Sequence, residues 1–437
     1  MVRRRSRWER FWDIPPSVAV ACLAAVLGGY LTYGLTVVLG AVGTEFGAKA
    51  DARPGSVAYY LGYSGTVRGT VLLLVRVGSL LSMVTTFLAD RRGRRRLLLV
   101  AYTIGMAASL LTATAAALWM FVGFQIVARS GLNSTSNLVG TIAAEETDRH
   151  TRSRAVAAVA AAWGAGAGVG AMVYAATKHT SLGWRGLYLG GLVGLALVPV
   201  LSRSLTETKR FAALPGPVGH TWRRLLRPPY RSRTVRLAAL HMLITVQGTP
   251  AGAFALVFAE KVRGLPSGRI AGVVVLAGPP GLLGLVASGR LADRLGRKPV
   301  GAAGLAVTAV AALGLYAGPS GLFAPSYWLL VTGAALAAPA IGTLGSEIFP
   351  TSARATASAL VGGVSIVSAA LSLQLFGILL DGLGSFGRAT AVLTVGPALA
   401  IVMLLTLPET KEHEMEEISP EFVDDATEST PLITSPF

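Results

Sequence analysis

The sequence predicts an all-α membrane protein in which twelve transmembrane helices form two six-helix bundles, with both termini in the cytoplasm. Three observations predict this fold class. Hydrophobic residues make up 52% of the 437 residues and charged residues only 14%, whereas a soluble domain is usually about 25% charged. The apolar residues gather in runs near the roughly 20 residues that a spanning helix needs. A hydrophilic stretch at 203–234 divides these runs into two sets of six.

The expected helices follow the apolar runs in order along the chain. The first run is too long for a cleaved signal peptide, so we expect it to be a retained spanning helix. The expected spans are 17–42, 68–88, 97–116, 118–142, 154–176, 185–202, 235–258, 269–288, 300–317, 325–345, 355–380 and 388–407.

Hydrophilic segments bound the two bundles. A basic N-terminal tail at 1–16 precedes the first bundle, 17–202, and the stretch at 203–234, which contains many Pro, Gly and Arg residues, indicates a linker. The second bundle is expected at 235–408, followed by an acidic tail at 409–437. The composition of this tail predicts that its end is disordered.

Lysine and arginine are distributed unequally between alternate loops. With the N-terminus inside, 28 of the 39 fall on the cytoplasmic side, nine on the other side, and two, Arg76 and Arg129, within helices. Positively charged loops stay in the cytoplasm, so both termini are expected there, in a multi-pass protein of the cytoplasmic membrane. The net charge of +17 then reflects membrane topology and not nucleic-acid binding.

Cysteine and histidine indicate neither a disulfide framework nor a metal site. Cys22 is the single cysteine, and the five histidines lack metal-ligand spacing. No Ser–His–Asp or Cys–His arrangement stands out, so we expect no enzyme, no metal and no cofactor. The glycines of 164–172 lie inside an expected helix with no strand before it, which favours close helix packing over a dinucleotide fingerprint.

One charged phrase occurs twice, at corresponding places in the two halves. Leu-Ala-Asp-Arg-x-Gly-Arg begins at Leu88 and again at Leu291, each time between two apolar runs. The phrase resembles the Gly-x-Leu-Ala-Asp-Arg-x-Gly-Arg-Arg signature of the major facilitator superfamily, as does the twelve-helix plan over almost the whole chain. The second copy has the opening glycine, Gly289, whereas the first has Thr86.

Further phrases are similar to those of sugar porters and of metabolite:proton and organic-ion symporters. They are "GSEIFPTSARATASAL" at 345–360, "EETDRHTRSRA" at 145–155, "LTETKRF" at 205–211 and "LPETKEHEMEEI" at 407–418. The second and third lack the prolines of the family pattern, and Glu412 replaces a usual glycine in the fourth. These phrases describe cytoplasmic gating charges and do not name a substrate.

The resemblance implies an inner gate that ion pairs hold shut. We expect Gly93 and Gly296 to allow tight turns, and arginines after them to pair with carboxylates on neighbouring helices. The alternative is that these charges are only topological anchors. The candidate gating residues are Asp90, Gly93, Arg94, Arg95, Glu146, Arg154, Glu207, Arg210, Gly289, Asp293, Gly296, Arg297, Glu347, Arg354 and Glu409.

Two basic residues are expected deep in the membrane. Arg76 lies 14 residues before Asp90, about 21 Å along a helix, and Arg129 lies 17 residues before Glu146, about 25 Å. A charge at such depth is costly and usually faces a cavity. Each arginine therefore either pairs with a helix terminus or backbone carbonyls, or attracts an anion into the central cavity.

Carboxylates are absent from the midpoints of the predicted helices, which weakens proton coupling through a buried acid. The phrase "GGYLTYG" at 28–34 lacks both acids of the Asp-Gly-Tyr-Asp-like stretch of related proton symporters. His241 is the remaining candidate proton carrier, and a packed structural histidine is the other interpretation. The neutral polar candidates for the cavity lining are Tyr30, Tyr33, Gln125, Asn133, Asn137, Gln247 and Gln374.

The expected function is secondary transport by alternating access, with a site at the midplane between two bundles. The electropositive interior favours a small organic anion as substrate. The alternative is a proton-coupled sugar or drug transporter of the same superfamily, and the rival class is a non-transporting sensor on the same fold. The expected partners are the lipid bilayer, a small-molecule substrate and a coupling proton; we expect a monomer and no nucleic-acid partner.

Overall fold

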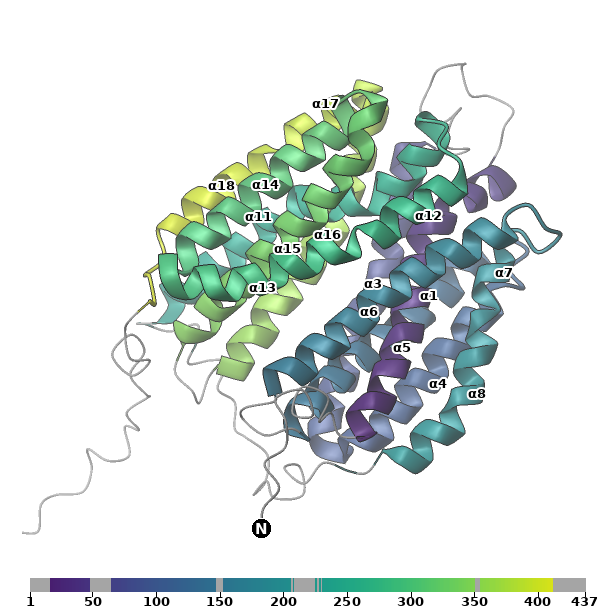
Figure 1. Ribbon diagram of the computed structural model, residues 1–437, viewed down its shortest axis with the longest axis horizontal. Helices are drawn as coiled ribbons and strands as arrows, with labels where there is room; N and C mark the ends of the chain where they lie inside the picture. Colours follow the sequence, from purple (N-terminus) through teal and green to yellow (C-terminus); the bar gives the residue numbers. More distant parts are fainter. Residues whose placement is uncertain are drawn as a thin grey trace, which may run out of the picture.

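The described residues form helices throughout (Figure 1). The computed structural model describes residues 16–47, 64–146, 152–205, 207, 225, 228, 230–349 and 354–411. Among these residues every regular element is helical, which confirms the predicted all-α class.

The N-terminal bundle contains five long helices and a sixth span built from two pieces. Its elements are α1 (Pro16–Phe46), α3 (Gly65–Arg92), α4 (Arg94–Thr112), α5 (Leu118–Glu145), α6 (Arg152–Thr177), α7 (Arg185–Tyr188) and α8 (Gly190–Ser204).

The C-terminal bundle repeats this plan with more breaks. Its elements are α11 (Tyr230–Val257), the π-helical turn η1 (Phe258–Val262), α12 (Ser267–Leu276), α13 (Gly278–Leu295), α14 (Arg297–Ala317), the 3-10 turn η2 (Ser320–Leu322), α15 (Phe323–Glu347), α16 (Arg354–Leu383), α17 (Phe386–Leu393) and α18 (Val395–Leu405).

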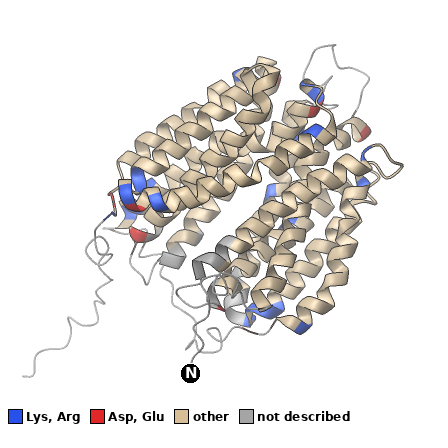
Figure 2. Cartoon of the chain, viewed as in Figure 1, with Lys and Arg blue, Asp and Glu red and all other residues tan. Residues whose placement is uncertain are grey.

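Eleven segments of the described chain are long and apolar enough to span a membrane. Helix α5 is not among them, although its 28 residues exceed the length a span needs; Gln125, Arg129 and Asn133 lower its apolar content. Large apolar side chains point outward elsewhere, and Trp119, for example, is 76% exposed. Charged residues gather at the helix ends, while the lengths of the bundles are mostly uncharged (Figure 2).

Two predicted spans are broken where proline removes a backbone donor. The eighth span stops at Ala277 and restarts in α13, whose first turn contains Pro279 and Pro280. The twelfth breaks at Thr394, three residues before Pro397. The eighth span also continues to Leu295, seven residues beyond its predicted end.

The two bundles meet along α1, α3 and α6 on one side of the interface and α11, α12 and α16 on the other. Glycine permits the closest approach. A Cβ on Gly377 of α16 would lie 2.2 Å from the carbonyl oxygen of Gly65 in α3. Within the first bundle, a Cβ on Gly166 of α6 would lie 2.0 Å from the carbonyl oxygen of Val26 in α1, so this glycine-rich stretch packs helix against helix.

The repeated phrases lie on a common side of the molecule. Two spans precede the α3–α4 turn and eight precede the α13–α14 turn, so both turns lie on the same side. We call this the motif side, and the opposite one the far side. The ribbons of the two bundles diverge toward the motif side and converge around α12 on the far side (Figure 1).

Candidate functional site

Glycine makes the turn at each copy of the repeated phrase. Gly93 has φ 96° and Gly296 has φ 103°, a region that favours glycine. Each residue separates two antiparallel helices, so the next helix begins immediately with exposed backbone amides.

A glutamate from the end of each bundle caps the helix that follows the glycine. Glu207 Oε1 accepts a hydrogen bond of 2.8 Å from Arg94 N. In the second half, Glu409 Oε1 accepts one of 3.0 Å from Arg297 N, and its Oε2 accepts one of 3.0 Å from Lys298 N. A carboxylate at a helix N-terminus satisfies unpaired amides and complements the helix dipole.

Glu409 is held in its ionised form by this cap. Burial alone would raise its pKa, but hydrogen bonds from the amides of Lys298, Arg297, Thr410 and Lys411 outweigh it and hold the pKa below the ordinary glutamate value.

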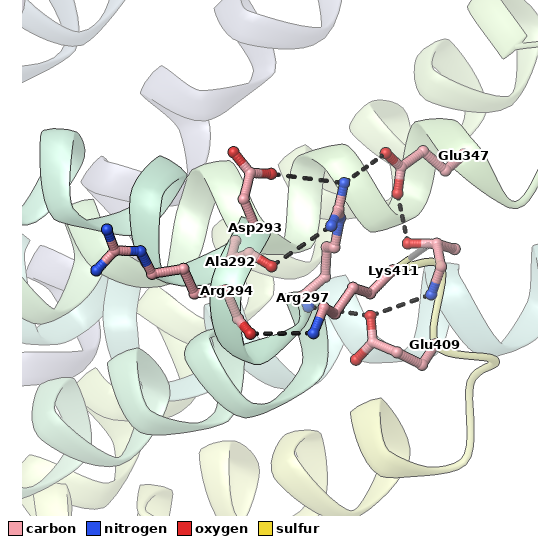
Figure 3. A network of polar contacts seen from close by, with 8 residues as sticks. Ala292, Asp293, Arg294, Arg297, Glu347, Glu409 and Lys411 are labelled. Atoms are coloured by element: carbon pink, nitrogen blue, oxygen red, sulfur yellow. Dashed lines mark hydrogen bonds and ion pairs between the residues drawn. The ribbon is translucent and has the colours of Figure 1, made fainter. Parts of the chain in front are cut away.

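Arg297 joins three helices of the second bundle (Figure 3). Its Nη2 lies 3.2 Å from Glu347 Oε1 and 3.7 Å from Asp293 Oδ1. Thr410 Oγ1 donates to the other oxygen of Glu347. In the first bundle, Arg95, two residues after Gly93, instead bonds backbone carbonyls: its Nε donates to Leu205 O at 2.6 Å and its Nη2 to Ser202 O at 2.6 Å.

These described contacts hold each bundle together and do not join the two bundles. The contacts given above for Glu207 and Arg95 stay within the first half, and those given for Arg297 and Glu409 within the second. Glu146 directly follows α5 and is half-buried, and Arg94 is 8% exposed. Arg210 lies outside the described residues, as do the side chains of Asp90, Arg154 and Arg354.

Gly289 has open space around it in α13. A Cβ there would meet no described atom within 4 Å. Close packing therefore does not require a glycine at position 289 in the second phrase. The first phrase has Thr86 at the corresponding position.

Polar contacts between the bundles lie on the far side. Asp381, at the end of α16, accepts hydrogen bonds from Gly65 N at 2.6 Å, Thr66 N at 2.7 Å and Thr66 Oγ1 at 2.6 Å. Lys178, after α6, forms an ion pair with Glu260 of η1.

The one amide candidate at the bundle interface is Gln374. Its Oε1 accepts a hydrogen bond of 2.9 Å from Thr70 Oγ1. This bond joins α16 to α3 one turn after Thr66 along α3 and two turns before Asp381 along α16.

A cavity of about 600 Å³ lies between the bundles. Helices α1 and α6 line it from the first bundle, and α11, α12, α13 and α15 from the second. Among the lining residues the two polar side chains are Tyr33, which is 45% exposed, and Tyr327. Tyr327 carried no sequence signal beyond its residue type.

Arg76 and Arg129 lie side by side at the same depth. Each is 11 residues from the start of its 28-residue helix, roughly 16 Å along the axis. A Cβ on Gly78 would lie 2.2 Å from Ile126 O and 3.1 Å from Arg129 Cβ, so α3 and α5 approach closely here. Both arginines are half-buried, and neither guanidinium group has a hydrogen-bond or ion-pair partner among the described residues.

Tyr33 connects this pair of arginines to the cavity. It lies within electrostatic range of Arg76, Arg129 and, across the interface, Tyr327. Asn133, one turn after Arg129, donates a hydrogen bond of 2.6 Å to Ser79 Oγ and so helps to hold α5 against α3. Arg76 and Arg129 therefore interact electrostatically with Tyr33, and of these three residues Tyr33 is the one that lines the cavity.

Four polar candidates lie in helix packing and not against the cavity. Tyr30 is 4% exposed and donates to Leu187 O. Gln125 donates to Thr112 Oγ1 at 3.0 Å, and Gln247 to Thr394 Oγ1 at 2.7 Å. His241 Nδ1 lies 3.0 Å from Leu237 O, one turn back in its own helix.

The remaining candidate, Asn137, is exposed on α5, two turns beyond Arg129. It is not among the residues that line the cavity.

Two family models match the chain. The one described as Major Facilitator Superfamily matches residues 21–288. The one described as Sugar (and other) transporter matches residues 281–422. A curated relative, the probable inorganic phosphate transporter 1-10 of Oryza sativa subsp. japonica, is 29% identical over an alignment of 221 residues that covers 45% of this chain. The match spans only 39% of that relative's length.

Solved structures share the fold over most of their length. The xylose transporter XylE from E. coli superposes with a TM-score of 0.69 at 19% identity, covering 92% of this chain and 98% of that one. The human organic anion transporter MFSD10 has a TM-score of 0.67 at 14% identity, covering 89% and 99%. The nucleoside transporter NupG has a TM-score of 0.70 at 13% identity, covering 89% and 99%.

Proposed function

The chain belongs to the Major Facilitator Superfamily of transporters, and we propose that its substrate is a small organic anion carried by alternating access. The observation that carries this proposal is the pair Arg76 and Arg129. Two like charges inside a membrane repel each other and are expensive to desolvate. An anion bound between them relieves both costs.

No described carboxylate can serve as the permanent counterion of this pair. The described acids of the spans lie near helix ends, as Glu45, Glu260, Glu347 and Asp381 do. Arginine forks bind carboxylates with two parallel hydrogen bonds, which adds geometric selectivity. In the proposed site the two arginines therefore bind the carboxylate of the substrate.

We further propose that the motif side is cytoplasmic and that the gating residues named above regulate access from it. Positive loops favour this orientation. The described bundle-bridging contacts of Asp381, Lys178 and Gln374 lie on the far side. In this arrangement the far side is closed, and the site communicates with the cytoplasm.

Binding to the purified protein in lipid nanodiscs tests the substrate class. We expect benzoate to raise the melting temperature, whereas hexoses and cationic drugs should not. Arg76→Gln should weaken benzoate binding by roughly 10- to 150-fold, because a hydrogen bond to a charged group contributes about 1.5–3 kcal/mol. Arg76→Lys should lose less if charge alone matters, and nearly as much if the planar fork is needed.

Arg388→Gln is the matched control, since Arg388 is exposed at the far side and distant from the pair in the fold. Counterflow of radiolabelled benzoate in proteoliposomes extends the test to transport. A well-folded Arg76→Gln, Arg129→Gln double variant that binds benzoate as tightly as wild type would refute the anion site.

A proton-coupled sugar transporter is the second candidate, favoured by the match of residues 281–422 to the sugar transporter family. The hexose arm of the same assay decides between the two, because stabilisation by hexoses and not by carboxylates would select the sugar alternative.

A further inference from the structure

We infer that the substrate is an amphipathic monoanion, with its carboxylate on the N-terminal bundle and an apolar body against the C-terminal bundle. The inference rests on the proposed function, and it deepens that function by naming the kind of organic anion.

The two halves of the site differ in chemistry. The charge comes from α3 and α5 of the first bundle, where Arg76 and Arg129 lie without partners among the described residues. The C-terminal bundle contributes mainly apolar side chains to the cavity. Its large apolar lining residues there are Leu256, Val274, Val275, Leu282, Leu285 and Val331.

The surface of α6 toward the cavity is made of small residues. Ala160, Ala161, Gly164, Ala165 and Gly168 line it. A Cβ on Gly164 would meet no described atom within 4 Å, so the space beside this helix is open. The cavity that Tyr33 lines is therefore both apolar and larger than a carboxylate needs.

Tyr33 marks the boundary between the two halves. Its hydroxyl lies within electrostatic range of both guanidinium groups, while its side chain lines the cavity. A carboxylate at the arginines thus directs the rest of the molecule past Tyr33 toward Val331 and Leu282.

The apolar lining disfavours substrates that are polar throughout. A sugar would bury several hydroxyl groups against Val, Leu, Ala and Gly, with two tyrosine hydroxyls as partners, and an unpaired buried hydroxyl is costly. Inorganic phosphate could bind the arginines but would leave the cavity unused. An apolar body fills it and gains the free energy of burial.

A series of straight-chain carboxylates tests this division. Affinity for acetate, butyrate, hexanoate and octanoate should rise by about four-fold per methylene until the cavity is filled. Alcohols of equal length control for partition into lipid, and they should bind weakly because they lack the charge.

Two variants separate the halves of the site. Arg76→Gln should weaken the binding of every carboxylate by a similar factor. The gain in affinity per methylene should stay unchanged. Gly164→Leu should fill the cavity, so that the affinity for octanoate falls while the affinity for acetate is unchanged. Gly123→Leu is the matched control, because Gly123 is an exposed helical glycine whose Cβ would also meet open space but which does not line the cavity.

The outcomes distinguish this inference from the proposed function. A flat chain-length series, or inorganic phosphate bound as tightly as octanoate, would overturn the amphipathic substrate, while a loss in Arg76→Gln would still support an anion site. Failure of every anion to bind would overturn both.

Discussion

Asp381 of α16 and Gly65 of α3 are joined across the bundle interface, since Gly65 N donates a hydrogen bond of 2.6 Å to Asp381 Oδ1. The carboxylate thus caps a helix of the other bundle, where the helix dipole also favours a negative charge. Glu207 and Glu409 cap helices of their own bundle. Asp381 is therefore positioned to stabilise one conformation of the carrier, and the two glutamates to stabilise each bundle in every conformation.

Asp381→Ala should shift the carrier toward conformations in which the far side is open. The ratio of open to closed molecules should rise roughly three- to ten-fold, because charge-assisted bonds are lost from an exposed position. Spin labels at Ser181→Cys and Gly321→Cys, one exposed site per bundle, report the far-side distance in a Cys22→Ser background. Glu45→Ala is the control, since Glu45 pairs with Arg185 within the first bundle. An unchanged distance distribution in Asp381→Ala would show that the cap does not select a conformation.

Glu409→Gln should lower stability at neutral pH by about 0.5–1.5 kcal/mol, the usual value of a helix cap. The effect should depend on pH in one direction. Since the folded pKa of Glu409 lies below the ordinary value, its contribution is present above that value and is lost as pH falls through the folded pKa. Melting temperatures of the wild type and of Glu409→Gln, measured from pH 7 downward, should become equal at pH values below the ordinary pKa of glutamate. A difference that stayed constant to the lowest pH would rule out ionisation as its source.

Gly296→Ala should destabilise the second bundle by about 1–3 kcal/mol. The residue has φ 103°, and an added Cβ would lie 2.8 Å from the Glu409 carboxylate. Gly289→Ala lies seven residues earlier in the same phrase and meets open space, so it should be neutral or slightly stabilising in a helix. Thermal unfolding of the two variants compares a strained glycine with an unstrained one, and equal melting temperatures would contradict the cap geometry.

Single cysteines should report the proposed orientation. In a Cys22→Ser background, Arg92→Cys and Leu295→Cys occupy exposed positions on the motif side, and Ser181→Cys an exposed position on the far side. An impermeant thiol reagent added to intact cells should label Ser181→Cys alone, because the positive loops are expected inside. Labelling of either motif-side cysteine from outside would contradict the proposed orientation.

The sequence was sufficient to predict the fold, but it could not predict which polar side chains line the cavity and which pack between helices. Apolar runs predicted the spans because lipid demands them. Tyr30 and Tyr33, however, are three residues apart in one apolar helix, and only the neighbouring helices decide that Tyr30 bonds Leu187 O while Tyr33 lines the cavity. A helix that is apolar all round gives no periodic signal of which face meets a cavity.

Contacts between distant segments were likewise beyond sequence reasoning. The repeated glycine turns were visible as a local phrase, and both glycines have positive φ. The Lys178–Glu260 pair joins residues 82 positions apart, and neither position carries a motif. Its partner assignment depends on how the bundles dock.

Arg76 and Arg129, which have no ion-pair partner among the described residues, would also make the proposed transport cycle sensitive to voltage. An elementary charge that crosses the whole membrane field changes in energy by about 2.3 kcal/mol per 100 mV. In the proposed cycle, alternating access moves the membrane field from one side of the site to the other, so the empty carrier would shift two positive charges and a carrier with a bound monoanion would shift one. The empty and loaded steps then depend differently on membrane potential, and a negative interior favours the conformation in which the pair is in electrical contact with the cytoplasm.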